Sequence, residues 1–216
     1  MKQLRAIIFD FDDTLIYSRI PWPEIKHKSA VMMAKTGISV SKAHEFSMKE
    51  LLDMAKKHQT ALYKKLWTLV EDYENRCALT AEIDPETPKI LKTLAQQFQL
   101  GIVTNNATRN THVILERFNI RKNFQIVLTR EDFSRTKPEP EGLLLSVKRL
   151  GVTKEECVYV GDSWVDGQAA TRAGIKFIGL NLKETKRKSE NYHCWKSIKH
   201  LRELLTILTD KKALLD

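Results

Sequence analysis

Residues 6–15 read AIIFDFDDTL, and this stretch decides the fold class. It begins with four small or apolar residues, at positions 6–9, without polar alternation, which is typical of a strand buried on both faces of a parallel sheet. Three aspartates follow within four positions, Asp10, Asp12 and Asp13. In open α/β sheets, ligands bind beyond the carboxyl ends of the strands. The stretch therefore predicts an α/β fold with an acidic site at the end of its first strand.

Further strand and helix patterns alternate along much of the chain. Short apolar runs of the same kind occupy residues 100–104, 125–129, 157–161 and 176–180. Amphipathic helical patterns occupy residues 88–97, 108–118 and 140–150, and Gly151 follows the last of them as a helix stop. A final pattern predicts a C-terminal helix that buries Ile198, Leu201, Leu205 and Leu208. This alternation predicts a Rossmann-like, three-layer α/β core with a parallel sheet.

One long segment interrupts the alternation. No strand pattern occurs within residues 17–83, and three helical patterns follow one another there, at residues 22–35, 41–57 and 59–79. Turns that contain proline flank the segment on both sides. The sequence therefore predicts an all-helical domain at residues 17–83, inserted into a core domain that comprises residues 1–16 and 84–216.

The composition is that of a globular protein that can bury a full core. The chain has 216 residues, 42% of them hydrophobic and 29% charged. Its three cysteines have no CxxC spacing, so we expect neither a disulfide framework nor a zinc site. No signal-peptide pattern begins the sequence and no apolar run has the length of a membrane span. These features predict a cytoplasmic protein without a membrane partner.

The net charge of +9 is spread over the chain. Residues 16–86 are nearly balanced, with 11 basic and 10 acidic side chains, whereas residues 87–182 carry 14 and 9 and residues 183–216 carry 9 and 5. This pattern favours anionic ligands in general. A nucleic-acid site would show basic clusters with interleaved aromatic residues, whereas the basic triplet at residues 186–188 offers charge alone and is expected to be a solvated loop. Nucleic acid is therefore not an expected partner.

Polar residues follow four of the predicted strands, where a parallel sheet would bring them together. They are Asp10, Asp12, Asp13 and Thr14 after the first strand, Thr104, Asn105 and Asn106 after the second, Lys137 beyond the third, and Asp162, Ser163 and Asp166 after the fourth. Each group alone is weak evidence, since any of them could be a turn or a helix cap. Four such groups in order, each at a carboxyl end, are much stronger evidence for a site.

A site of this composition needs cations. Four carboxylates that converge in one cleft (Asp10, Asp12, Asp162 and Asp166) repel each other, and burial adds to the cost of their charge. A hard divalent ion suits carboxylate and carbonyl oxygens, and Mg²⁺ is the usual ion beside phosphate. Lys137 supplies a further positive charge. With Mg²⁺ and Lys137 present, the cleft becomes a receptor for anions.

The combination resembles the haloacid dehalogenase superfamily of hydrolases, in its phosphatase branch with phosphoglycolate phosphatase-like members. The resemblance covers the whole chain and rests on four motifs: Asp10-Phe11-Asp12-Asp13-Thr14, Thr104-Asn105, Lys137, and Gly161-Asp162-Ser163-Trp164-Val165-Asp166. The helical segment is similar to the cap domain of these enzymes. One position departs from the common pattern, because Asp13 stands where many relatives have glycine; we expect Asp13 to be a turn or rim residue and give it no catalytic role.

The resemblance implies roles for the acidic residues. Asp10 would be the nucleophile that attacks phosphorus, forming an aspartyl-phosphate. Asp12 would protonate the leaving oxygen and then deprotonate the water that releases phosphate. Mg²⁺ would be held by Asp10, by the main-chain carbonyl of Asp12 and by Asp162.

The resemblance also implies a phosphate grip and its supports. Thr104, the main-chain amide of Asn105, and Lys137 would bind the phosphoryl oxygens. Asp166 would orient Lys137 or the water ligands of the metal from behind. Thr14 would brace the loop that carries the nucleophile.

Several alternatives remain open at this point. Dehalogenases and phosphonatases of this superfamily lack the acid at the position of Asp12, so phosphoryl transfer is favoured. A phosphatase and a phosphomutase use Asp10 and Asp12 alike, and the phosphatase is the first expectation. A catalytically silent binding protein would have lost the nucleophile or the lysine, and both are present. The expected substrate is a small phosphorylated metabolite, its leaving group is not readable, and a monomer or a homodimer would suit the chain.

Overall fold

The computed structural model describes residues 3–34, 36–46, 48–182 and 191–208. The chain divides into two compact units, Met1–Tyr17 with Ala81–Asp216, and Ser18–Thr80. These limits lie next to the boundaries expected at residues 17 and 83. The basic triplet at residues 186–188, expected to be a solvated loop, lies outside the described residues.

A six-stranded parallel sheet forms the centre of the first unit. Its strands are β1 (Ala6–Phe9), β2 (Gln99–Val103), β3 (Ile126–Leu128), β4 (Cys157–Gly161), β5 (Lys176–Leu180) and β6 (Lys196–Ile198). Their order in the sheet is β3-β2-β1-β4-β5-β6. Strand β1 thus lies between β2 and β4, with Phe9 in register with Ile102 on one side and Val160 on the other. The predicted Rossmann-like α/β core is confirmed.

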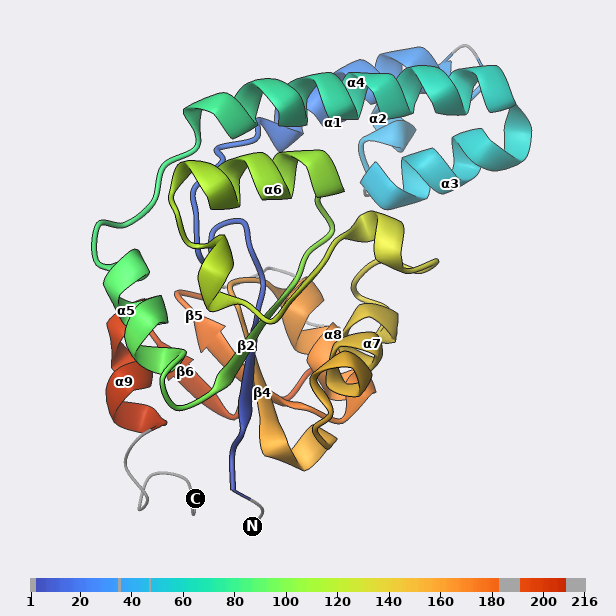
Figure 1. Ribbon diagram of the computed structural model, residues 1–216. Helices are drawn as coiled ribbons and strands as arrows, with labels where there is room; N and C mark the ends of the chain where they lie inside the picture. Colours follow the sequence, from blue (N-terminus) through green and yellow to red (C-terminus); the bar gives the residue numbers. More distant parts are fainter. Residues whose placement is uncertain (1–2, 35, 47, 183–190, 209–216) are drawn as a thin grey trace. The chain divides into compact units, whose positions relative to one another are not determined.

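Helices cover both faces of this sheet, which gives the unit its three layers. In Figure 1, α5 (Thr87–Leu94) and α9 (Leu204–Ile207) lie on one side of the strands, and α7 (Glu141–Leu150) and α8 (Trp164–Ala173) lie on the other. Helix α6 (Thr108–Arg117) follows β2. Both faces of β1 are consequently buried, and all four of its residues have no exposed surface. This burial explains why the strand carries no polar alternation.

The C-terminal helix was predicted too long. Ile198 does not lie on it, because residues 196–198 form β6, which pairs with β5 through Leu180 and Ile198. The helical part is a 3₁₀ turn at Leu201–Glu203 followed by the short helix α9. An apolar residue every three to four positions suits a buried strand end joined to a short helix as well as one continuous helix, so the spacing alone could not separate them.

The second unit is entirely helical in its described residues. Its helices are α1 (Trp22–Ala34), α2 (Val40–Ala43), α3 (Met48–His58) and α4 (Thr60–Thr80). Ala30, Met33, Leu51 and Leu66 form a buried core between them. The helix predicted at residues 41–57 is divided into α2 and α3, and the N-cap of α2 is Ser39, whose hydroxyl accepts a hydrogen bond from the Lys42 amide.

The chain enters and leaves the helical segment through two paired positions. Tyr17 and Glu82 form an antiparallel bridge in which the amide of each residue donates to the carbonyl of the other, at 2.8 and 3.0 Å. The 64 residues between them are therefore bounded by one hydrogen-bonded pair in the first unit. No helix in the described part of the chain has both the length and the apolar character of a membrane span.

Gly151 ends α7 in the left-handed conformation, with a φ of 64°. An alanine at this position would meet no atom within 4 Å, so its only cost is conformational. We expect Gly151→Ala to lower the free energy of unfolding by about 1 kcal/mol, and Gly151→Asn to lower it less, because asparagine tolerates this conformation. Urea unfolding of the three proteins checks the order, and an alanine variant as stable as the wild type would contradict it.

Candidate active site

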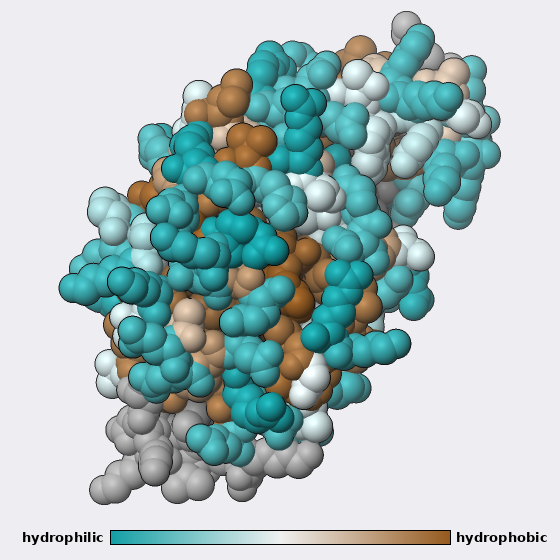
Figure 2. Space-filling view, viewed as in Figure 1, coloured by the Kyte–Doolittle hydropathy of each residue, from teal (hydrophilic) through white to brown (hydrophobic). Residues whose placement is uncertain are grey.

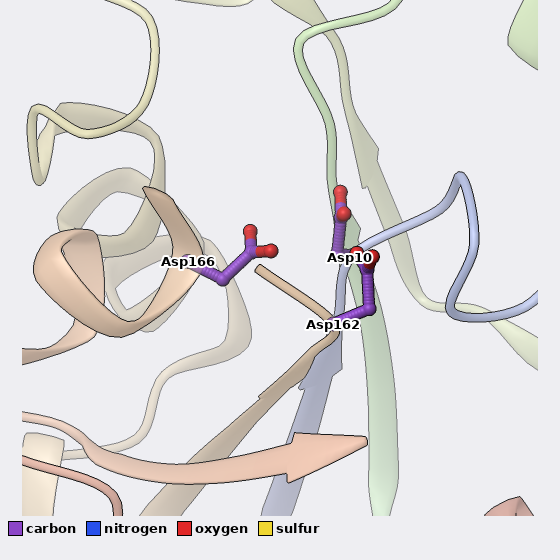
Figure 3. Close-up of side chains that lie close together, drawn as sticks. All are labelled: Asp10, Asp162 and Asp166. Atoms are coloured by element: carbon purple, nitrogen blue, oxygen red, sulfur yellow. The ribbon is translucent and has the colours of Figure 1, made fainter. Parts of the chain in front are cut away.

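Three carboxylates come together at the carboxyl ends of the two central strands. Asp10 follows β1, Asp162 follows β4, and Asp166 lies in the first turn of α8. Figure 3 shows the Asp166 side chain extending from its helix toward the other two. One oxygen of each carboxylate lies within 4.8 Å of the others. The register of β1 with β4 causes this meeting, because the Asp10 amide continues the ladder by donating to the Val160 carbonyl at 2.8 Å.

A buried lysine neutralises part of this charge. The Lys137 ammonium lies 2.6 Å from Asp10 Oδ1 and 2.6 Å from Asp166 Oδ1. It also donates to the hydroxyl of Tyr159 at 2.8 Å. Lys137 is 5% exposed, Asp10 8% and Asp166 not at all, so solvent screens these charges little. The sequence prediction that Lys137 and the aspartates converge is met by these distances.

The burial of so many charges shifts the pKa values of the site. Burial and the charge of Asp166 raise the pKa of Asp10 well above its ordinary value, although Lys137 opposes the shift. Burial also works against the charge of Lys137, but Asp10 and Asp166 outweigh it and raise the pKa of the ammonium, which stays protonated. Burial, together with Asp166 and Asp13, raises the pKa of Asp162 to about 7. One lysine therefore does not compensate three carboxylates.

Both oxygens of Asp166 have protein partners. Oδ1 accepts from Lys137 and Tyr159, and Oδ2 accepts from the amide and the hydroxyl of Ser163, which forms a capping box with Asp166 at the start of α8. The packing is so close that a Cβ at Gly161 would lie 2.6 Å from Asp166. These contacts suit a residue that supports Lys137 from behind more than a residue that binds a ligand directly.

The remaining acidic groups fit a hard divalent cation. Asp10 and Asp162 present carboxylate oxygens within 4.8 Å of each other, and such hard oxygen ligands suit a divalent ion. Asp10 and Asp162 belong to an acidic cluster that could hold a metal ion, and the assignment of Mg²⁺ to them stays a prediction. The predicted contribution of the Asp12 carbonyl stays a prediction.

Asp12 is half-buried and is held by a residue to which the sequence analysis gave no role. Its Oδ2 accepts a hydrogen bond from the side-chain amide of Asn106. Asn106 is 8% exposed, and its main-chain carbonyl accepts from the Arg130 amide at 3.1 Å. The sequence feature that could have indicated a role for Asn106 is its position directly after Thr104 and Asn105 at the end of β2. The exposed Asp13 has a φ of 53°, the turn geometry expected of it.

The other predicted residues lie in the same loops, with different contacts. The Asn105 side chain makes two hydrogen bonds with the main chain of Lys137, at 3.0 and 3.1 Å, and so joins the loop after β2 to the lysine loop. The buried Thr104 hydroxyl accepts from the Asn106 amide at 3.1 Å. The hydroxyl of Thr14 is buried and makes no hydrogen bond within the described residues, so no hydrogen bond of this hydroxyl supports the predicted bracing role.

Comparisons with known proteins agree with this geometry. Residues 7–180 match the family model of the haloacid dehalogenase-like hydrolases. A phosphoglycolate phosphatase of Photorhabdus laumondii is 30% identical over 190 residues, which cover 83% of this chain and 81% of that protein. A phosphoglycolate phosphatase of Salmonella paratyphi A is 42% identical over 97 residues, 43% of this chain. That match spans only 38% of the length of the Salmonella protein.

A solved structure extends the similarity to the fold. The haloacid dehalogenase-like hydrolase of Bacteroides fragilis superposes with a TM-score of 0.74 over 94% of this chain and 100% of its own, at 24% identity. A match to the family model over residues 7–180, with a relative similar over four fifths of both chains, establishes that this chain belongs to the haloacid dehalogenase-like hydrolase family.

Proposed function

We propose that this protein is a Mg²⁺-dependent phosphatase that hydrolyses a small phosphorylated metabolite through an aspartyl-phosphate at Asp10. The observation that carries the proposal is the contact of Asp10 with the buried ammonium of Lys137, beside the carboxylate of Asp162. A carboxylate so placed is positioned for attack on an anion, because the same cations that hold it attract the phosphoryl group. The likeness to phosphoglycolate phosphatases supports the choice of a small anionic substrate.

In the first step, an oxygen of Asp10 attacks phosphorus, and the bond from phosphorus to the leaving oxygen breaks. Asp12 gives its proton to that oxygen, so the product leaves as an alcohol. In the second step, Asp12 takes a proton from a water molecule, whose oxygen attacks phosphorus. The bond between phosphorus and Asp10 breaks, and inorganic phosphate and the Asp10 carboxylate are formed.

Other residues of the site bind and orient the phosphoryl group. Lys137 and the main-chain amide of Asn105 are the proposed donors to its oxygens, with the Thr104 hydroxyl beside them. Bound through Asp10, Asp162 and the Asp12 carbonyl, Mg²⁺ would offset the negative charge of the phosphoryl group. Asp166 keeps Lys137 in place, and Thr14 belongs to the loop that carries Asp10. The helical domain of residues 17–83 is the proposed source of substrate selectivity.

Phosphate release from a panel of phosphorylated metabolites, with and without Mg²⁺, tests the proposal. We expect Mg²⁺-dependent turnover by the wild type and a loss of about a thousandfold or more in Asp10→Asn. Asp72→Asn is the control, since it removes an exposed carboxylate of the helical unit and should change turnover less than about threefold. Turnover that survives in Asp10→Asn, measured on protein freed of other phosphatases, would refute the mechanism.

The same panel separates the phosphatase from the phosphomutase. Phosphoglycolate and other small carboxylated phosphates come first, and sugar monophosphates follow. A phosphomutase would convert a sugar monophosphate into its isomer with little release of inorganic phosphate. That result would keep Asp10 as the nucleophile and overturn hydrolysis as the function.

The role of Asp12 can be tested through its partner. Loss of the Asn106 amide in Asn106→Ala should lower turnover of an alkyl phosphate about tenfold, because the acid is less well placed to protonate the leaving oxygen. An activated aryl phosphate, whose leaving group needs little protonation, should be affected less than about threefold. Equal losses on both substrates would indicate that Asn106 supports the loop and not the acid.

Metal binding should be visible in the dependence of stability on pH. Asp162 titrates at about 7 in the folded protein, against an ordinary value of 3.8. Between these values the folded state binds more protons than the unfolded state, so without metal the free energy of unfolding falls as pH rises from about 4 to about 7. We expect a smaller fall in Asp162→Asn.

Mg²⁺ should reverse this loss in the wild type, because it binds the ionised carboxylates of the folded state. Thermal unfolding at about pH 8 should show a rise in Tm with Mg²⁺ for the wild type and for the exposed control Asp72→Asn, and little rise for Asp162→Asn. Equal pH profiles and equal Mg²⁺ responses in all three proteins would remove Asp162 from the metal site.

A further inference from the structure

Tyr159 places a hydroxyl at the base of the site, where the proposed mechanism uses none. The residue lies in the middle of β4, between Val158 and Val160, and has no exposed surface. Its ring packs against Phe177, with the centroids 6.3 Å apart, inside the core of the first unit. A phenylalanine would supply the same apolar contacts. The hydroxyl must therefore be explained by its polar partners.

The two near partners of this hydroxyl are charged groups of the candidate site, while a third acceptor, the main-chain carbonyl of Val103, lies farther away at 3.4 Å. The Tyr159 oxygen lies 2.8 Å from the Lys137 ammonium and 2.8 Å from Asp166 Oδ1. A phenol has one proton to give, and an ammonium can only donate. Tyr159 therefore accepts from Lys137 and donates to Asp166. Burial, with the charges of Asp166 and Asp10, raises the pKa of Tyr159 well above its ordinary value, so the hydroxyl keeps its proton.

The contact completes the coordination of the ammonium. Lys137 has three N–H donors and three acceptors around them: Asp10 Oδ1 at 2.6 Å, Asp166 Oδ1 at 2.6 Å and Tyr159 Oη at 2.8 Å. Two of these acceptors, Asp166 and Tyr159, are also bonded to each other, so they form a fixed platform. Rotation of the ammonium would break hydrogen bonds of a group that is only 5% exposed, where an unmade bond is costly.

We propose that Tyr159 is a positioning residue of the phosphatase reaction, which fixes the Lys137 ammonium against Asp10 by a hydrogen bond from below. The inference rests on the proposed function. When Asp10 attacks phosphorus, the Lys137 donor that it held can pass to a phosphoryl oxygen. Tyr159 and Asp166 keep the other two donors, so the ammonium does not have to reorganise as the charge moves.

The test is Tyr159→Phe, with Tyr73→Phe as the matched control. Tyr73 is 7% exposed and loses a hydrogen-bonded hydroxyl in the helical unit, where its partners are Glu24 and Lys28. We expect kcat per folded enzyme to fall about tenfold in Tyr159→Phe and less than about twofold in the control. An unchanged kcat in Tyr159→Phe would overturn the proposal.

A double-mutant cycle separates positioning from a structural effect. If Tyr159 acts through Lys137, Tyr159→Phe should lower kcat about tenfold in the wild type and less than about twofold in a Lys137→Ala background. A purely structural role would lower kcat by the same factor in both backgrounds, and that result would also overturn the proposal.

A measurement without substrate keeps this inference separate from the proposed function. By NMR, the ¹H–¹⁵N signal of the Lys137 ammonium should be protected from exchange in the wild type and lose protection in Tyr159→Phe. A rapidly exchanging ammonium in the wild type would refute the positioning role even if the variant did not fold. Absence of any Mg²⁺-dependent turnover by the wild type would refute the phosphatase instead, and the ammonium signal would still report on Tyr159.

Discussion

The site depends on one buried cation. Lys137 lies within 2.6 Å of two carboxylates and is itself 5% exposed, so each charge is tolerated only because the others are near. The sheet makes this possible, since β1 lies between β2 and β4 and delivers Asp10 between the loops that follow both neighbours. The lysine loop is tied in turn to the end of β2 by the side chain of Asn105. The contacts of Lys137 and Asn105 therefore hold the loops of the core together and also position the charged groups of the site.

The sequence was sufficient for the parts that depend on local pattern. Unalternated apolar runs predicted β1, β4 and β5 with their observed limits, because strands buried on both faces leave that pattern. The polar residues after the first, third and fourth strands predicted the convergence of Asp10, Lys137, Asp162 and Asp166, because parallel strands share one carboxyl edge. Gly151 was recognised as a helix stop for a similarly local reason, its left-handed conformation.

Parts that depend on contacts between distant segments could not be predicted. Asn106 and Asp12 are 94 positions apart, and nothing in either neighbourhood specifies their hydrogen bond. Tyr159 stands within an apolar strand run, and the sequence does not show that Lys137 and Asp166 lie beside its hydroxyl. The spacing of apolar residues also did not show that β6 and α9 are separate elements, because β6 forms only by pairing with β5. Local pattern fixes the elements, whereas tertiary pairing assigns these polar contacts.

The bridge between Tyr17 and Glu82 has an evolutionary consequence. Its two hydrogen bonds bring the start and the end of the helical segment to adjacent positions. The segment is therefore an insertion into the first unit whose two ends lie side by side. Gain, loss or exchange of such an inserted segment does not displace the chain on either side of it, because the two junctions stay adjacent whatever sequence lies between them. Strand β1 and helix α5 would keep their places through each exchange. A lineage could thus replace the whole segment of residues 18–80, and with it the substrate selectivity proposed for that segment, while the aspartates and the lysine of the first unit stayed unchanged.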